Sequence, residues 1–385
     1  MPSGRALYRC WESPQKARME AGEWFTVSCS LQLAGLTKMH RYAISSLLLL
    51  AVVWLAGPVS AQPKPEGVIV LYHHVAEDTP PSTSISPENF RRHLEYLRDN
   101  GFTVVGLDKM VEAAREGIDL PEKSVAITFD DGYESIYTTA FPLLQEFNFP
   151  FTLFLSTGPI DRNQPNYMTW ANIRDMAEAG VLIANHMVEH PYMLDRTNGE
   201  SLQEWEARLE QELLLAEARI EEETGQSLRY LAYPYGEFDP QIKAMLQRNS
   251  FTGFAQNSGA VGQHSDFLAL PRFPLASIYA NLETAATKFA TRPFNAGLVE
   301  PRSPVTTDRS PSVRLRFEPG DYDRQQIGCF ANSKPIPMIW ESESVVLLQP
   351  EEEYGGRRWR YICTAPDPAS RRYFWYSVQW IHTGG

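Results

Sequence analysis

The sequence predicts an α/β domain of parallel strands covered by helices, followed by a small all-β domain. Between residues 68 and 255, apolar runs of strand length alternate with segments of helical period, an order typical of a parallel sheet. Between residues 313 and 381, short aromatic runs separated by Gly and Pro replace that pattern, as in a β-sandwich or barrel. The stretch 293–311, rich in Pro, Arg, Ser and Thr, is expected to be a linker between them.

The length and composition agree with two globular domains. The chain has 385 residues, 43% of them hydrophobic, which is enough for a substantial core. Its net charge of −12 argues against a nucleic-acid partner, because such proteins normally carry a basic patch.

The first part of the chain has the pattern of an export signal. Residues 1–38 have no clear periodicity and are expected to be a misassigned start or a tail. A basic segment begins at Met39, the apolar run 43–56 follows, and small residues end at Ala61. The apolar run is shorter than the ~20 residues that span a bilayer. We therefore expect a signal peptide over 39–61 and a secreted or periplasmic protein without membrane insertion; the alternative is an uncleaved anchor.

The elements of the α/β domain follow from apolar periodicity and from helix start signals. A helix is expected to begin at Pro87, with Ser86 as its N-cap and Phe90, Leu94 and Leu97 on its buried face. Expected strands are 68–72, 103–105, 125–129, 151–155, 181–184, 228–232 and 252–255. Expected further helices are 107–114, 133–147 with a kink at Pro142, 170–179, 202–223 and 241–248.

Chemically active residues follow the ends of several expected strands. His73, Asp130, His186 and Tyr235 each come directly or closely after an apolar run. Because α/β folds of this kind place their chemistry at the carboxyl ends of parallel strands, we expect these residues to form one active site.

Two of these places carry more than one candidate group. Asp130 and Asp131 leave the strand together before Gly132, so their side chains diverge and can take different roles; a plain Asp-Asp-Gly turn is the alternative. His186 and His190 are four residues apart, and a helical turn would place both on one face. With Asp131 they would give the three ligands of a catalytic zinc site, whereas two unrelated surface histidines remain the alternative.

Three motifs resemble the polysaccharide deacetylase family, carbohydrate esterase family 4, also called the NodB-homology domain. They are Thr128-Phe-Asp-Asp-Gly132, the His186 to His190 segment, and Tyr233-Pro-Tyr-Gly236. The resemblance covers about 68–289 and implies a domain over 67–292 with a distorted (β/α) barrel. Met187 and Tyr233 depart from the family pattern, which usually has Ser or Thr and Arg at these places.

The resemblance also implies roles for individual residues. Asp130 is the expected base, and Asp131, His186 and His190 are the expected ligands of a divalent metal, with Zn²⁺ as the expected ion. The backbone N–H of Tyr235 is expected to bind the oxyanion. Since Tyr233 cannot supply the usual cation beside Asp130, we expect Arg272 to do so; the alternative is a solvated loop Arg.

The expected catalytic acid lies near the start of the domain. No His follows the third motif near Arg272, where the family usually has one. Tyr72-His73-His74 instead resembles the rearranged motif order of the exopolysaccharide poly-N-acetylglucosamine deacetylases, which implies His73 as the acid. His74 would point to the opposite face. A packed core His is the alternative for His73, and His264 is the rival acid.

The expected function is therefore that of a secreted, metal-dependent hydrolase that removes N-acetyl groups from an N-acetylglucosamine-type polysaccharide. It would act on carbon–nitrogen bonds other than peptide bonds. Two alternatives remain: an O-acetyl esterase on an acetylated glycan, and a carbohydrate-binding protein without activity.

The expected C-terminal domain, 312–385, contains Cys329 and Cys363. Export would favour a disulfide between them, and two buried free thiols are the alternative. Its tryptophans are Trp340, Trp359, Trp375 and Trp380. One or two of them would suit a glycan-binding face, and simple core packing is the alternative.

Overall fold

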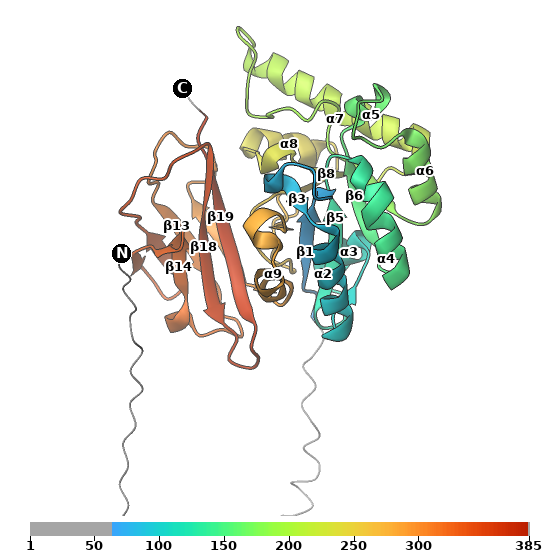
Figure 1. Cartoon of the computed structure of the whole chain (residues 1–385). Coiled ribbons are helices and arrows are strands. Elements are labelled where there is room, and N and C mark those ends of the chain that lie inside the picture. The colour runs from blue at the N-terminus through green and yellow to red at the C-terminus, as the bar shows by residue number, and fades with distance from the viewer. Residues whose placement is uncertain (1–63, 384–385) are drawn as a thin grey trace, which may run out of the picture. The chain divides into compact units, whose positions relative to one another are not determined.

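A computed structural model describes residues 64–383 (Figure 1). The expected signal peptide, the segment before it, Cys10 and Cys29 lie outside the described residues. Within the described part, a search finds no helix that is long and apolar enough to cross a membrane.

The larger sheet contains eight strands, and all of its paired strands run parallel. The order is β10-β1-β5-β6-β7-β8-β9, with β4 beside the first half of β5. The bounds are β1 Gly67–Tyr72, β4 Thr103–Val104, β5 Ser124–Phe129, β6 Phe151–Leu155, β7 Leu182–Asn185, β8 Tyr230–Ala232, β9 Thr252–Phe254 and β10 Phe273–Pro274. Every strand expected between residues 68 and 255 is present, within a few residues of its expected ends.

A short segment, 270–274, links the two edges of this sheet. At one edge Leu270 bridges Phe254 of β9, and its N–H donates to the carbonyl of Gly253 at 2.8 Å. At the other edge Phe273 is the register partner of Val70 in β1. The segment therefore closes the sheet into a barrel, although with few hydrogen bonds on either side.

Helices surround the strands in Figure 1, and side-chain caps begin most of them. The N-cap side chains of Ser86, Thr169, Ser201, Asp239 and Asn281 each accept a backbone N–H from the first turn. The helices are α2 Pro87–Asp99, α3 Leu107–Glu116, α4 Phe141–Phe147, α5 Thr157–Asp161, α6 Trp170–Glu178, α7 Leu202–Thr224, α8 Pro240–Arg248 and α9 Leu282–Phe289.

Short elements complete this part of the chain. The expected helix over 133–147 is divided into a π-helical turn, η2 Ile136–Ala140, and α4. Pro142 is at the start of α4, directly after this π-helical turn, and it cannot donate a backbone N–H to that turn. The remaining pieces are η1 Pro81–Thr83, η3 Pro234–Gly236, η4 Ser277–Ala280 and the strand pair β2 His74–Val75 with β3 Ser84–Ile85.

The two faces of the barrel sheet pack against different partners. Side chains that alternate along the strands contribute to two separate cores. The inner core takes one small or apolar residue from each of six strands and packs against α3: Ile69, Ala126, Phe154, Ala184, Ala232 and Phe254. The outer core joins the opposite face to α2, α4, α6 and α9.

The C-terminal residues form two mostly antiparallel sheets around a hydrophobic core of their own. One has the order β11-β19-β18-β14-β15 and the other β12-β13-β17-β16. Their bounds are β11 Arg292–Pro293, β12 Ala296–Glu300, β13 Val313–Phe317, β14 Gly328–Ala331, β15 Lys334–Pro335, β16 Met338–Trp340, β17 Val345–Leu348, β18 Arg358–Pro366 and β19 Tyr373–Ile381, with the turn η5 Arg324–Gln326. Only the pair β11–β19 is parallel.

Three expectations for this region have clear outcomes. Cys329 and Cys363 are register partners in β14 and β18 and form a disulfide, which confirms the predicted pairing. The stretch expected to be a linker contains β12, which pairs with β13 along its length. The two aromatic runs after residue 372 form one strand, β19.

The four tryptophans belong to the packing of these sheets. Trp359 and Trp380 are buried in the core, and Trp340 is half-buried against Phe317 with Arg324 over its ring. Trp375 packs edge-on against Phe273 of β10, with 5.4 Å between ring centroids. None of these rings is a free exposed surface.

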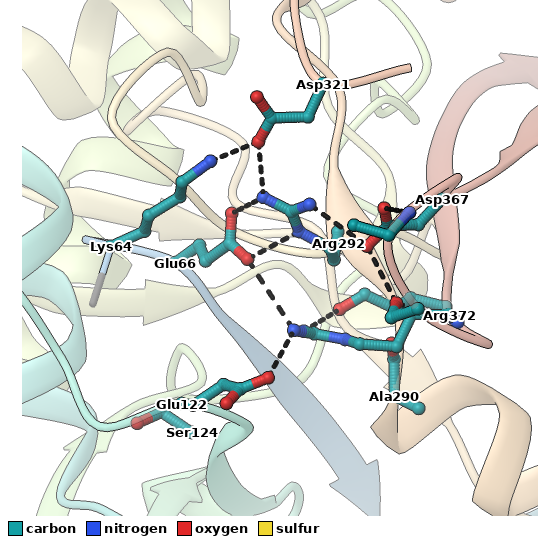
Figure 2. A network of polar contacts seen from close by, with 12 residues as sticks. Lys64, Glu66, Glu122, Ser124, Ala290, Arg292, Asp321, Asp367 and Arg372 are labelled. Carbon is teal, nitrogen blue, oxygen red and sulfur yellow. Dashed lines mark hydrogen bonds and ion pairs between the residues drawn. The ribbon is translucent and has the colours of Figure 1, made fainter. Parts of the chain in front are cut away.

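An ionic network connects the start of β1 with the C-terminal sheets (Figure 2). Arg292 pairs with Glu66 at 2.8 Å, with Asp367 at 3.1 Å and with Asp321 at 3.1 Å. Arg372 donates to the carbonyls of Ala290 and Thr291. Both guanidinium groups are largely buried, so their partners carry charges that water can compensate only partly.

The network gives a test of stability. Arg292→Ala should lower the free energy of unfolding by about 3 kcal/mol, because it leaves Glu66 and Asp367 without their main cation. The exposed pair between Arg91 and Glu146 provides the control. Arg91→Ala should lower the free energy of unfolding far less, because exposed ion pairs contribute little to stability. Urea unfolding measures both, and equal losses would contradict a special role for Arg292.

Candidate metal centre and catalytic site

The polar residues predicted to act together lie at the carboxyl edge of the barrel sheet. Asp130 and Asp131 follow β5, His186 follows β7, and His73 follows β1. The N–H of Asp130 donates to the carbonyl of Tyr72 at 3.0 Å, which holds the ends of β5 and β1 together.

Asp130 and Arg272 form a fully buried, bidentate ion pair. Arg272 Nη1 lies 2.6 Å from Oδ1 of Asp130, and Nη2 lies 2.7 Å from Oδ2. Both side chains have 0% exposed surface. Burial opposes ionisation of Asp130, but Arg272 outweighs it, with help from His186 and His73, and the pKa of the carboxyl lies below its ordinary value.

The guanidinium of Arg272 is fixed by further contacts. Its Nε donates to the carbonyl of Ala255 at 3.0 Å, and its plane lies over the ring of Phe154, 5.2 Å from the centroid. Arg272 belongs to the closing segment 270–274. Closure of the barrel therefore places this cation beside Asp130. Arg272 is therefore not a solvated loop residue, which was the alternative.

Asp131, His186 and His190 point toward one another. Oδ1 of Asp131 lies 3.2 Å from Nε2 of His186 and 3.3 Å from Nε2 of His190. One ligand atom from each residue lies within 4.8 Å of the other two. Within the described residues, Asp131 Oδ1 and His186 Nε2 are buried and have no hydrogen-bond partner of good geometry.

These atoms suit a divalent metal. Nδ1 of His186 lies 2.7 Å from the carbonyl of Ala232, so this nitrogen carries the proton and Nε2 presents its lone pair. Burial, with a smaller effect of His186, lowers the pKa of His190 to about 4, so this ring is neutral at pH 7. Two imidazole nitrogens and one carboxylate oxygen match the ligand set of a catalytic zinc site with one position open.

The backbone that carries these ligands differs from the expectation. The helical turn predicted for His186 to His190 is wrong, because this segment is a loop after β7. Met187 and His190 have positive φ angles of 68° and 52°, and Asp131 has φ 77°. Left-handed residues turn the chain back on itself, so the loop brings both rings to one place without a helix.

Two supporting residues escaped the sequence-based prediction. Asn185 accepts the N–H of Met187 on Oδ1 at 2.8 Å and donates from Nδ2 to Glu217 at 3.0 Å. Glu217, in α7, is buried and also accepts from Ser227 and from the N–H of Arg229. The side chain of Met187 cannot form the hydrogen bond that a Ser or Thr at this position would form. Asn185 instead holds the loop by its hydrogen bond to the N–H of Met187. The Glu-rich sequence of α7 gives no signal that singles out Glu217.

The two neighbouring histidines after β1 have different surroundings. His74 is buried and stacks on Tyr133, with 3.6 Å between ring centroids. His73 is half-buried and directly follows Tyr72, the last residue of β1, whose carbonyl accepts the N–H of Asp130. His264, the rival, is exposed and lines a different cavity together with Asp266 and Trp375.

Tyr235 lies at a sharp turn next to the metal ligands. Its φ is 57°, and Gly236 after it has φ 71°. The ring of Tyr235 lies edge-on to the ring of His190, with 4.4 Å between the ring centroids, and it stacks on the ring of Tyr192, with 3.9 Å between the centroids. Tyr233 is buried and donates its hydroxyl hydrogen to the carbonyl of Leu268, so it is part of the hydrophobic core.

Comparisons with known proteins agree with this geometry. The family model described as polysaccharide deacetylase matches residues 117–254. The poly-beta-1,6-N-acetyl-D-glucosamine N-deacetylase of Escherichia coli strain K12 is 24% identical over 257 residues, which are 57% of this chain and 38% of that protein. The protein of the same name from Staphylococcus epidermidis is 26% identical over 49% of this chain and 67% of its own length. The chain thus spans well under half of the Escherichia coli relative.

Solved structures show the same fold. IcaB from Ammonifex degensii has a TM-score of 0.52 at 27% identity, covering 58% of this chain and 98% of that one. A Streptococcus pyogenes deacetylase in complex with acetate has a TM-score of 0.53 at 20% identity, over 59% and 99% of the two chains. The predicted distorted barrel of NodB-homology type, followed by β-sheets, is confirmed.

The support of the metal loop can be tested apart from catalysis. Glu217→Gln should weaken Zn²⁺ binding roughly tenfold or more, because outer residues that orient metal ligands typically contribute 10- to 100-fold. Glu221→Gln, at an exposed position of the same helix, should leave binding unchanged. Competition with a fluorescent chelator measures both affinities. Equal affinities in the two variants would show that Glu217 serves the fold alone.

Proposed function

We propose that this chain, whose residues 117–254 match the family model described as polysaccharide deacetylase, is a metal-dependent N-deacetylase of an N-acetylglucosamine polysaccharide. One observation carries the proposal: a buried carboxylate kept ionised by Arg272 lies beside a convergent set of three metal ligands. The names of the relatives, which specify poly-beta-1,6-N-acetyl-D-glucosamine, support this polymer as the substrate.

The proposed mechanism divides the work between neighbouring residues. When bound by Asp131, His186 and His190, a divalent metal supplies a Lewis acid that polarises the acetyl carbonyl and lowers the pKa of water. Asp130 accepts a proton from the attacking water, and Arg272 keeps Asp130 charged until then. The N–H of Tyr235 donates to the oxygen that gains negative charge. His73 donates a proton to the leaving nitrogen, so acetate and a free amine are the products.

The proposal includes export. The expected signal peptide is consistent with it, and the Cys329–Cys363 disulfide supports it, because such bonds persist mainly in oxidising compartments.

Acetate release is the direct test. The wild-type mature chain with Zn²⁺ should release acetate from β-1,6-linked N-acetylglucosamine oligomers. Chelation or Asp131→Ala should abolish this release. Acetylated xylan serves as the ester substrate: release from xylan alone would favour an O-acetyl esterase, and release from neither would favour a carbohydrate-binding protein.

The role of the acid can be tested separately. His73→Gln should lower kcat roughly 100-fold, since general acid catalysis contributes about 10²–10⁴, while Zn²⁺ content stays unchanged. His264→Gln is the matched control and should keep full activity. A larger effect of the His264 variant would show that the rival residue is the acid.

A further inference from the structure

The turn 233–237 beside the metal ligands is held by side chains from the C-terminal sheets. Three consecutive residues of the turn accept hydrogen bonds from them. Arg358 Nη1 donates to the carbonyl of Tyr235 at 3.1 Å. Gln379 Nε2 donates to the carbonyl of Gly236 at 2.6 Å. Arg357 holds the carboxylate of Glu237 with two bonds of 2.7 Å each.

Glu237 makes this connection energetically important. Its side chain has 0% exposed surface, so an unpaired charge there would be costly. In the part of the chain that the structure describes, its ion-pair partners are Arg357 and Arg358, the latter at 3.2 Å. A buried carboxylate of the barrel therefore obtains its counter-charge from the start of β18.

The same two arginines reach the metal site through stacked rings. The guanidinium carbon of Arg357 lies 4.6 Å from the ring centroid of Tyr192, and that of Arg358 lies 5.3 Å from the ring centroid of Tyr235. Tyr192 and Tyr235 stack in nearly parallel planes, and Tyr235 contacts the ring of His190. A continuous chain of packed side chains thus links the start of β18 to His190, a proposed metal ligand.

The turn needs such external contacts. Tyr235 has a left-handed φ of 57°, which is energetically unfavourable for a residue other than Gly. Conformations of this kind persist only where the surroundings determine them. A β-carbon at Gly236 would lie 2.8 Å from Cβ of Gln256, so the backbone of the turn packs closely against the residue that follows β9 and Ala255.

We propose that Arg357, Arg358 and Gln379 are positioning residues of the active site. They fix the backbone of Tyr235 relative to His190, so the C-terminal sheets are part of the catalytic unit. This inference rests on the proposed function of the site, because it assigns the three side chains to the same reaction.

The test compares variants of the full mature chain loaded with Zn²⁺. Arg358→Ala and Gln379→Ala should each lower kcat for N-acetylglucosamine oligomers roughly tenfold to hundredfold, because small displacements of catalytic groups cost this much. KM should change less than kcat, and Zn²⁺ content should remain at one per chain. Gln379→Ala is included because it removes a neutral hydrogen bond and leaves no buried charge unpaired. Arg358→Lys should recover part of the lost kcat.

Arg360→Ala is the matched control. Arg360 lies two residues further along β18 and donates to the carbonyl of Gln256 and to Ser258, outside the turn. Its loss should leave kcat within about threefold of wild type, since no oxyanion donor moves. An equal loss of kcat in this variant would overturn the proposal.

Amide hydrogen exchange gives a readout that does not depend on turnover. Exchange in a peptide covering 233–237 should accelerate in Arg358→Ala and Gln379→Ala, and it should be unchanged in Arg360→Ala. Unchanged exchange in the first two variants would overturn the positioning role, whether or not they are active. If the wild-type chain releases no acetate but the exchange result holds, the proposed function fails and the anchoring of the turn stands.

Discussion

The ion pair between Asp130 and Arg272 is the interaction on which the rest of the site depends. Moving two charges out of water costs several kcal/mol for each ion, and only good geometry offsets that cost. Here two short parallel hydrogen bonds join the partners, and the remaining Nε of Arg272 has its own acceptor on Ala255. A proton-accepting carboxylate can therefore stay charged in a closed, dry interior.

The other parts of the site are held with comparable redundancy. The proposed metal ligands lie on turns with left-handed residues at Asp131, Met187 and His190, and a further left-handed residue is Tyr235. Two of these turns are held by side chains from neighbouring elements: Asn185 accepts the N–H of Met187, and residues of β18 and β19 donate to the carbonyls of Tyr235 and Gly236. Strain of this kind at a functional site persists because rigid strands and a second layer of hydrogen bonds determine it.

Most of the barrel could be predicted from the sequence because its strands are short apolar runs ended by polar residues or Gly. The same rule placed Asp130, Asp131 and His186 at one edge. The helical turn for His190 was wrong because a spacing of four residues also fits a loop with left-handed residues. The strand β12 was missed because the surrounding Pro-, Arg- and Ser-rich composition outweighs its short run Ala296–Glu300.

Residues whose interaction partners are distant in the sequence were harder to predict. Arg272 pairs with a residue 142 positions earlier, and its local sequence is equally compatible with a solvated loop, so the sequence left both possibilities open. Glu217 and Glu237 look like ordinary surface acids until the fold shows what surrounds them. Their positions depend on which helix or sheet packs above the strand ends, and local periodicity does not contain that information.

The short closing segment also dictates when the site can exist during folding. Strand β1 begins at residue 67, but its neighbour β10 begins at residue 273, so closure joins segments separated by most of the domain. Contacts at such separation form late, because the entropy of closing the intervening chain must be overcome first. As the polypeptide lengthens from its N-terminus, Asp130 and the metal ligands emerge long before Arg272. Until β10 pairs with β1, Asp130 lacks its buried cation, so its carboxylate can carry a charge at low cost only where water reaches it.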